Sequence, residues 1–99
     1  MPTPPADEDD AEDLRELLHG DPKLRHLRVR KRASVLTVES GPKDDPVQHV
    51  RLRRLTLHKW TLEIATHMGD WQPTGERALM KELVAYLRHQ CPWVLQAVE

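Results

Sequence analysis

The chain has 99 residues, of which 38% are hydrophobic and 31% charged, and its formal net charge at pH 7 is −1. This size suits one small domain with a core large enough to fold alone, and it excludes two such domains. No apolar run has membrane-spanning length, and the acidic, proline-rich start differs from a secretory signal, so we expect a cytoplasmic protein. The single cysteine, Cys91, agrees with a reducing compartment.

Charge is divided unevenly along the chain. Residues 1–21 contain eight acidic residues and one basic residue, a net charge of −7, while the other 78 residues carry +6. This division predicts either that an acidic arm folds over a basic surface of its own domain or that each half meets a different partner. The simpler alternative is that both regions are solvated surfaces.

The N-terminal region predicts a short tail followed by a helix. Residues 1–6 are expected to be disordered because they include three prolines and too little apolar surface to bury. A single α+β domain is expected over residues 7–99. It begins with a helix from Asp7 to His19, with acids at its start and Gly20 at its end. An apolar stripe of Ala11, Leu14, Leu17 and Leu18 indicates an edge helix docked on its own sheet, or alternatively a detachable partner-binding helix.

Residues 24–40 alternate as a β-hairpin does, with the turn centred on Arg32-Ala33. The loop that follows, residues 40–46, contains glycine, two prolines and paired aspartates. The pairs expected in the hairpin are Val29 with Leu36 and Leu27 with Val38 on the inward side, and Arg30 with Val35, Arg28 with Thr37 and His26 with Glu39 on the outward side.

A second hairpin is predicted over residues 46–71, with a two-residue turn at His58-Lys59. Its alternation slips at Arg53-Arg54, and a β-bulge there would restore the phase. Inward residues are then Leu55, Leu57, Trp60 and Leu62. The remaining expected pairs are Arg54 with Glu63, Leu52 with Ile64, and His49 with His67.

The C-terminal region predicts a short strand and a helix. After a turn at residues 68–70, Trp71-Gln72 adds a fifth strand that Pro73 ends. With Thr74 as its N-cap, a helix follows over residues 75–90. We expect its stripe of Leu79, Met80, Leu83, Val84 and Leu87, the tryptophans, and the tail at Trp93, Val94 and Leu95 to pack on the sheet.

These elements predict an α+β fold: an antiparallel sheet of four to five strands, made of two β-hairpins, packs against a C-terminal helix, with a short acidic N-terminal helix. Short motifs accompany this order of elements, namely Pro46-Val47, Trp60-Thr61-Leu62, Gly69-x-Trp71 and a terminal Trp93. With these motifs, residues 24–95 resemble a family of small uncharacterised bacterial α+β domains of unknown function. The chain departs from that pattern at Cys91-Pro92-Trp93, where Phe-Trp-Gly is expected, and at Arg53-Arg54-Leu55, where a turn is expected. The resemblance supports the fold and implies no mechanism, because the family has no assigned activity.

Enzyme signatures are missing from the sequence: there is no glycine-rich phosphate loop, no CxxC, no HExxH and no nucleophile elbow. His49 and His67, expected to face each other on the outward side, could bind zinc if a third ligand approached. The neighbouring arginines would repel a cation, so an exposed histidine pair without a metal is predicted. A metal-dependent or histidine-based enzyme is the third alternative for function.

The outward side is expected to be a basic face that could follow a phosphate backbone. The lack of phenylalanine and the inward Trp60 argue against the aromatic platforms of single-strand binders.

We therefore expect a small non-enzymatic binding or regulatory module that acts through a protein partner, without cofactor or membrane. The alternative is a nucleic-acid-binding domain with an arginine-rich sheet face that the acidic N-terminal arm masks in part; a homodimer through a sheet edge is left open. The candidate binding residues are Arg28, Arg30, Arg51, Arg54, His49 and His67.

Overall fold

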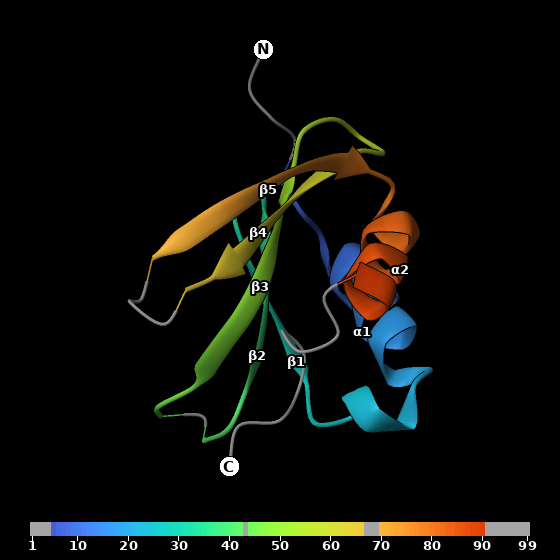
Figure 1. Cartoon of the computed structure of the whole chain (residues 1–99). Helices are drawn as coiled ribbons and strands as arrows, with labels where there is room; N and C mark the ends of the chain where they lie inside the picture. The colour runs from blue at the N-terminus through green and yellow to red at the C-terminus, as the bar shows by residue number, and fades with distance from the viewer. Residues whose placement is uncertain (1–4, 43, 67–69, 91–99) are drawn as a thin grey trace.

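Five antiparallel strands form one sheet in the order β1-β2-β3-β4-β5 in the computed structural model, which describes residues 5–42, 44–66 and 70–90. The strands are β1 (Arg28–Arg32), β2 (Val35–Ser40), β3 (Val47–Arg54), β4 (Trp60–Ala65) and β5 (Trp71–Ala78). The helices are α1 (Glu8–His19), α2 (Met80–Gln90) and the short 3-10 helix η1 (Pro22–Leu24). Both α-helices lie on the same side of the sheet (Figure 1). The predicted α+β fold is confirmed.

The core lies between the sheet and the two helices, because each element turns one apolar side inward. Leu36, Val38, Val50 and Leu52 alternate with polar residues along β2 and β3, and all four have no exposed surface. Burying one such side chain contributes about 1.5–3 kcal/mol. The other core residues include Leu14, Leu18, Leu24, Leu27, Trp60, Leu62, Leu83, Val84 and Leu87.

Helix α1 begins at a capping box and docks on the sheet as predicted. The backbone N–H of Asp10 donates to the Asp7 carboxylate at 2.9 Å, and the backbone N–H of Asp7 donates to the Asp10 carboxylate at 3.0 Å. Ala11, Leu14 and Leu18 of α1 are buried in the core, as the edge-helix interpretation predicts; the alternative of a detachable partner-binding helix stays a prediction. The predicted disordered tail is wrong at its last two residues: Ala6 is buried, and its N–H donates to the carbonyl of Ala33 at 2.9 Å. Residues 1–4 lie outside the described part of the chain.

The first hairpin has the predicted faces but a different register. Arg28 pairs with Glu39 and Val29 with Val38, a shift of two residues from the expected pairs. The turn is the two-residue segment Ala33-Ser34, and the strands pair as far as Arg32 and Val35. A shift of two residues preserves the side-chain faces because the period of a strand is two. The inward residues of β2 are therefore the predicted ones.

The predicted bulge at Arg53-Arg54 is wrong, and so is the two-residue turn at His58-Lys59. Strand β3 continues its alternation to Arg54, which pairs with Trp60, and residues 55–59 form a loop. The backbone N–H of Leu55 donates to the Lys59 carbonyl at 2.8 Å and closes this loop. The pairs on the ladder are Val50 with Ile64, Arg51 with Glu63, Leu52 with Leu62, Arg53 with Thr61 and Arg54 with Trp60.

Two of the four residues expected on the inward side of this hairpin are not part of the core. Trp60 and Leu62 are buried as predicted, whereas Leu55 and Leu57 are 39% and 60% exposed. Assigning both leucines to a strand is the error that required the bulge. Because they belong to the loop, the sheet needs no irregularity between β3 and β4.

Strand β5 is longer than predicted, and α2 is correspondingly shorter. Pro73 does not end the strand, since β5 is an edge strand where a residue without an N–H is tolerated. Thr74 is not an N-cap, because its hydroxyl donates to the Leu62 carbonyl at 3.1 Å within the sheet. Helix α2 starts at Met80 and buries Leu83, Val84 and Leu87, which confirms that part of the predicted stripe.

The turn predicted at residues 68–70 and the tail at residues 93–95 fall partly or wholly outside the described residues. Among the residues that are described, no helix has the length and apolar character needed to cross a membrane.

Candidate functional site

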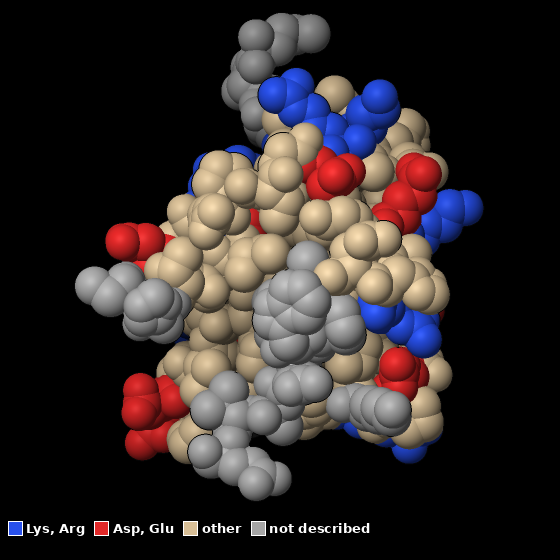
Figure 2. Space-filling model, in the orientation of Figure 1, with Lys and Arg blue, Asp and Glu red and all other residues tan. Residues whose placement is uncertain are grey.

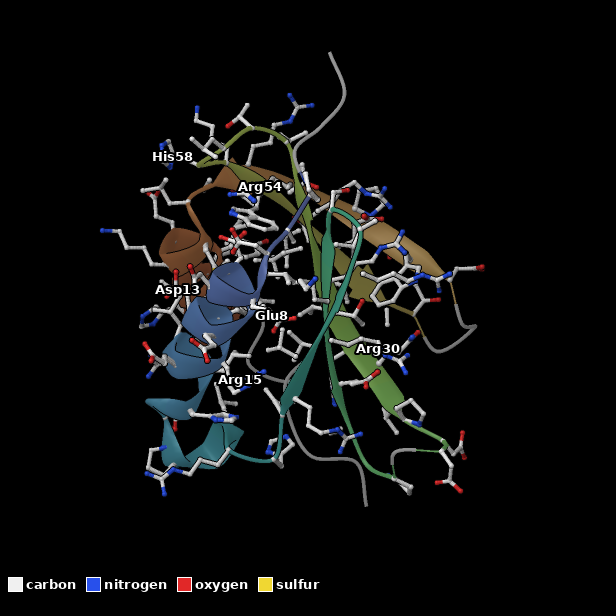
Figure 3. All side chains as sticks on the ribbon, turned by 180° about the vertical axis from the view of Figure 1, so that it is seen from behind. Glu8, Asp13, Arg15, Arg30, Arg54 and His58 are labelled. Atoms are coloured by element: carbon white, nitrogen blue, oxygen red, sulfur yellow. The ribbon has the colours of Figure 1, made fainter. Side chains whose placement is uncertain are left out.

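The structure divides the six candidate binding residues between different places. Arg30 and Arg51 lie on the open side of the sheet, away from the helices, as predicted; Figure 3 shows Arg30 there. Arg28 has the predicted strand parity but is half-buried, and its Nη1 donates to the Gly41 carbonyl at 2.6 Å. His67 lies outside the described residues.

Arg54 is not part of an outward basic face, which corrects the prediction. Its side chain points to the helix side of the sheet and is only 7% exposed. The unbroken alternation of β3 requires this direction, since Leu52 and Arg54 share one parity. A buried guanidinium needs several acceptors, and α1 with its preceding residues and the loop supplies them.

The contacts of Arg54 join three elements. Nη1 donates to the Asp10 carboxylate at 2.8 Å and to the Pro5 carbonyl at 2.8 Å. Nη2 donates to the Leu57 carbonyl at 2.8 Å, and Nε to the Thr56 carbonyl at 3.3 Å. The guanidinium also lies 5.0 Å from the centre of the Trp60 ring. One side chain therefore fixes the position of α1 relative to the 55–59 loop.

His49 is buried, so the predicted exposed histidine pair is wrong. It lies at the irregularity between β2 and β3, where Val38 pairs with Val50 but Glu39 pairs with Gln48. Its Nε2 is 2.7 Å from the Ser40 hydroxyl, and the His26 ring packs edge-on at 6.4 Å between centroids. Among the described residues, no group of three potential metal ligands comes together.

A groove of about 460 Å³ opens on the helix side, between α1, the 55–59 loop and the start of α2. Figure 3 shows Asp13 of α1 and His58 of the loop on this side of the molecule. We call it the helix-side groove; its lining residues are Asp10, Asp13, Glu16, Leu17, Leu57, His58, Trp60, Leu79, Met80 and Lys81.

The helix-side groove combines exposed leucines with an acidic wall. Leu57 is 60% exposed and Leu79 is 38% exposed, and both line the same groove, so they present apolar surface to solvent together. Asp13 and Glu16 are one helical turn apart on α1, and neither makes an ion pair with any described residue. The groove is therefore apolar at its surface and negative along one wall.

The start of α1 adds negative charge near this wall. A hydrogen bond from the Asp10 backbone N–H holds the pKa of the exposed Asp7 carboxyl below its ordinary value of 3.8, and the charge of Arg54 acts in the same direction. Asp7 therefore stays ionised at neutral pH. In Figure 2, Lys and Arg atoms gather at the top of the molecule, and others lie beside acidic atoms on the right.

A second hollow, of about 330 Å³, lies on the open side of the sheet. We call it the open-side cleft; its lining residues are Arg30, Arg32, Ala33, Val35, Thr37, Gln48, Arg51 and Trp71. Trp71 is half-buried, and the Arg51 guanidinium stacks on its ring at 4.5 Å from the centroid. The sequence-based assignment of all tryptophans to the core is wrong for Trp71.

Glu63 neutralises part of the charge beside the open-side cleft. Its carboxylate accepts from Nε and Nη2 of Arg51 at 3.1 and 2.9 Å, and from Nε of Arg53 at 3.3 Å. The hydrogen bonds from Arg51 lower the pKa of Glu63 below its ordinary value of 4.5; burial opposes this shift, and the charges of Arg51 and Arg53 add to it. Arg30 and Arg32 have no carboxylate partner in the described part of the chain.

Sequence reasoning missed both hollows. The helix-side groove was hidden because Leu57 and Leu79 were assigned to apolar stripes, and the open-side cleft because Trp71 was assigned to the core. The sheet places Trp71 opposite Ala65, on the same side as Glu63, and this pairing has no signal in the local sequence pattern. Comparison with protein-family models, curated proteins and solved structures finds no match for this chain. The resemblance to small bacterial domains therefore stays a prediction.

Proposed function

We propose that this protein is a small non-enzymatic binding module that holds a basic, amphipathic helix of a protein partner in the helix-side groove. The observation that carries the proposal is the exposure of Leu57 and Leu79 at a concave surface whose wall bears uncompensated carboxylates. Apolar side chains kept in water at such a place are typical of recognition surfaces.

The shape of the groove favours a helical ligand. Its walls are α1 and the first turn of α2, and helices pack against helices at interaxial distances of about 8–10 Å. A helix with leucines at positions i, i+3 and i+4 would place them on Leu17, Leu57 and Met80. The loop carrying Leu57 is held by Arg54 before any partner arrives, which lowers the entropic cost of binding.

Charge complementarity favours a basic ligand. Asp13 and Glu16 lie along one side of the groove, so lysines or arginines flanking the leucines of the partner would meet opposite charge. Lys81 on the opposite wall disfavours a ligand that is basic on both flanks. We therefore expect a partner helix with one apolar stripe and one basic flank.

Selection of displayed random 16-residue peptides on the intact protein tests this proposal, with counter-selection on the Leu57→Ser variant. The enriched peptides should carry leucine or isoleucine at helical spacing with a net positive charge, and bind with dissociation constants on the order of 1–100 μM. Leu57→Ser should weaken binding at least fivefold, and the double variant Asp13→Asn/Glu16→Gln about threefold at low salt.

Leu55→Ser is the matched control, because Leu55 belongs to the same loop and is exposed but does not line the groove. It should leave the affinity unchanged. The proposal is wrong if selection enriches acidic or non-helical peptides, or if the two serine variants bind equally well.

A further inference from the structure

The open-side cleft is a second candidate site, on the opposite side of the sheet from the groove of the proposed function. Three guanidinium groups, from Arg30, Arg32 and Arg51, line it together with the Trp71 ring. Ala65 stands opposite Trp71 on β4, and its small side chain lets the indole reach across that strand to Arg51 on β3. Four strands thus contribute to one hollow.

The charge of the cleft is positive and accessible. No acidic residue lines it among the residues that the structure describes. Arg30 and Arg32 are exposed, and Glu63 neutralises only Arg51 among the three cleft arginines. An anion entering the cleft would therefore meet two uncompensated guanidinium groups.

The acidic arm does not cover this cleft, which corrects the predicted masking for the described residues of the arm. Helix α1 lies on the other side of the sheet, where Asp10 pairs with Arg54 and Glu8 lies 3.8 Å from Lys31 (Figures 1 and 3). Trp71 lies on the open side beside Arg51, so an aromatic ring faces outward, contrary to the prediction that the outward side lacks one. Both objections to nucleic-acid binding are thereby removed for this surface.

The residue types at the cleft indicate a ligand with phosphates and an aromatic ring. Arginine forks suit phosphate oxygens, and Arg30 and Arg32, two residues apart on one strand, are spaced by about 7 Å, which favours more than one phosphate. The stacked pair of Trp71 and Arg51 offers a planar surface to a base, and Thr37 and Gln48 can hydrogen-bond its edge. A base paired in a duplex cannot lie flat on such a surface.

We propose that the open-side cleft binds a nucleotide unit of single-stranded nucleic acid, with phosphates on Arg30 and Arg32 and a base against the Trp71–Arg51 stack. The binding is driven by charge and stacking, so it tolerates different base sequences.

Fluorescence anisotropy of the intact chain with labelled 12-nucleotide RNA and DNA single strands tests the proposal. Affinity should fall as salt rises, with a slope of log K against log salt of about −1.4 for two neutralised phosphates. The Arg30→Gln/Arg32→Gln variant should bind roughly tenfold more weakly, and Trp71→Leu roughly tenfold more weakly. Competition by a mononucleotide, titrated from micromolar to millimolar concentration, distinguishes a free nucleotide from a strand. A mononucleotide site is emptied at micromolar competitor, whereas a strand site is not.

Three further variants distinguish strand binding at the cleft from an effect of net charge or of the helix-side groove. Arg25→Gln/Arg88→Gln removes the same charge outside the cleft and should change affinity less than twofold. Glu63→Gln removes the negative charge that neutralises Arg51 and should increase the affinity for single strands about threefold. If the cleft residues had only a structural role, this substitution would not increase the affinity. Leu57→Ser, in the groove, should bind strands as wild type does, so each proposal can fail without the other. Folding of every variant is checked by its thermal unfolding midpoint.

Several outcomes would overturn the cleft assignment. These are equal affinity for duplex and single strands, equal losses in the Arg25/Arg88 and Arg30/Arg32 variants, full displacement by a mononucleotide at micromolar concentration, or no detectable binding at low salt by folded wild-type protein.

Discussion

Arg51 and Arg54 lie three residues apart on β3 and face opposite sides of the sheet. Arg54 is 7% exposed and bonds a carboxylate and three carbonyl groups of α1, its preceding residues and the loop. Arg51 is 22% exposed and bonds one carboxylate, that of Glu63 on the neighbouring strand, while its plane stacks on Trp71. The first arginine holds elements together, whereas the second lies at a surface that a ligand can reach.

The difference arises from what covers each side of the sheet. On the helix side, α1 and the loop exclude water, so a buried guanidinium requires a hydrogen-bond acceptor for each of its donors. These hydrogen bonds fix the positions of the elements that supply the acceptors. On the open side, solvent screens the arginines, and one carboxylate is enough to hold Arg51 and Arg53 together. The same residue type on the same strand therefore acts structurally on one side and is available for binding on the other.

Arg54→Ala should have the largest effect on stability. Removing the guanidinium leaves the Asp10 carboxylate without its cationic partner and three carbonyls without their side-chain donor, and should lower the free energy of unfolding by about 3 kcal/mol. Arg54→Lys should lose about half as much, since lysine retains the charge without the fork. Urea unfolding at 25 °C measures both. The neighbouring Arg53→Ala, on the open side, should lower the free energy of unfolding by less than about 1 kcal/mol. Equal losses for Arg53→Ala and Arg54→Ala would contradict the difference between the two sides of the sheet.

Glu63→Gln should have a smaller effect that depends on pH. The carboxylate of Glu63 is 14% exposed and its pKa is lowered, so its pairing stabilises the fold above the ordinary pKa of 4.5. At pH 7 the substitution should lower the free energy of unfolding by about 1 kcal/mol. This difference should decline as the pH falls below 4.5 through the lowered pKa, because the wild-type carboxyl then takes up a proton. A difference that grows toward low pH would contradict the assigned pairing.

Ala33→Asn tests the conformation of the turn between β1 and β2, which contacts both the helix side and the open side of the sheet. The carbonyl of Ala33 accepts from Ala6 on the helix side, and its side chain lines the open-side cleft. Its φ of 51° lies in the left-handed region, which asparagine tolerates better than alanine. We expect a gain of about 0.5 kcal/mol in thermal unfolding experiments. A loss of stability would show that the turn conformation is not the one described.

Leu57→Ser should have the smallest effect on the fold. This side chain is 60% exposed, so its replacement should change the free energy of unfolding by no more than about 0.5 kcal/mol in urea titrations. Leu62→Ser on the neighbouring strand is the contrast, since Leu62 is 1% exposed and its loss should destabilise by several kcal/mol. A large loss in Leu57→Ser would make that leucine part of the core and remove the basis of the helix-side groove.

The side of the sheet on which a side chain lies could be predicted for several strand residues even where the predicted strand pairing was wrong. Because side chains alternate with a period of two, Leu36, Val38, Trp60 and Leu62 were assigned to the inward side correctly, although the first hairpin was out of register by two residues. The stripe of α1 was predicted for the same reason, from its helical period.

Loop length and the direction of Arg54 could not be predicted in this way. Leu55 and Leu57 are separated by one polar residue, as inward residues of a strand are, although they are out of phase with Val50 and Leu52, so their spacing did not reveal a loop. In the loop, Arg54 donates to the Thr56 and Leu57 carbonyls, and the same guanidinium bonds Asp10 of α1, which is distant in the sequence. Likewise, Trp71 is outward because of its pairing with Ala65, which no local pattern indicates.

Local periodicity in the amino-acid sequence by itself determined the α+β class, the apolar sides of β2 and β4 and the start of α1, because these depend on neighbours within a few residues. Only the tertiary structure decided that Arg54 is enclosed while Arg51 is accessible, and that Leu57 and Leu79 border a groove. The physical reason is that a buried charge or an exposed leucine is defined by groups distant in the chain, which supply the acceptors or leave the surface uncovered.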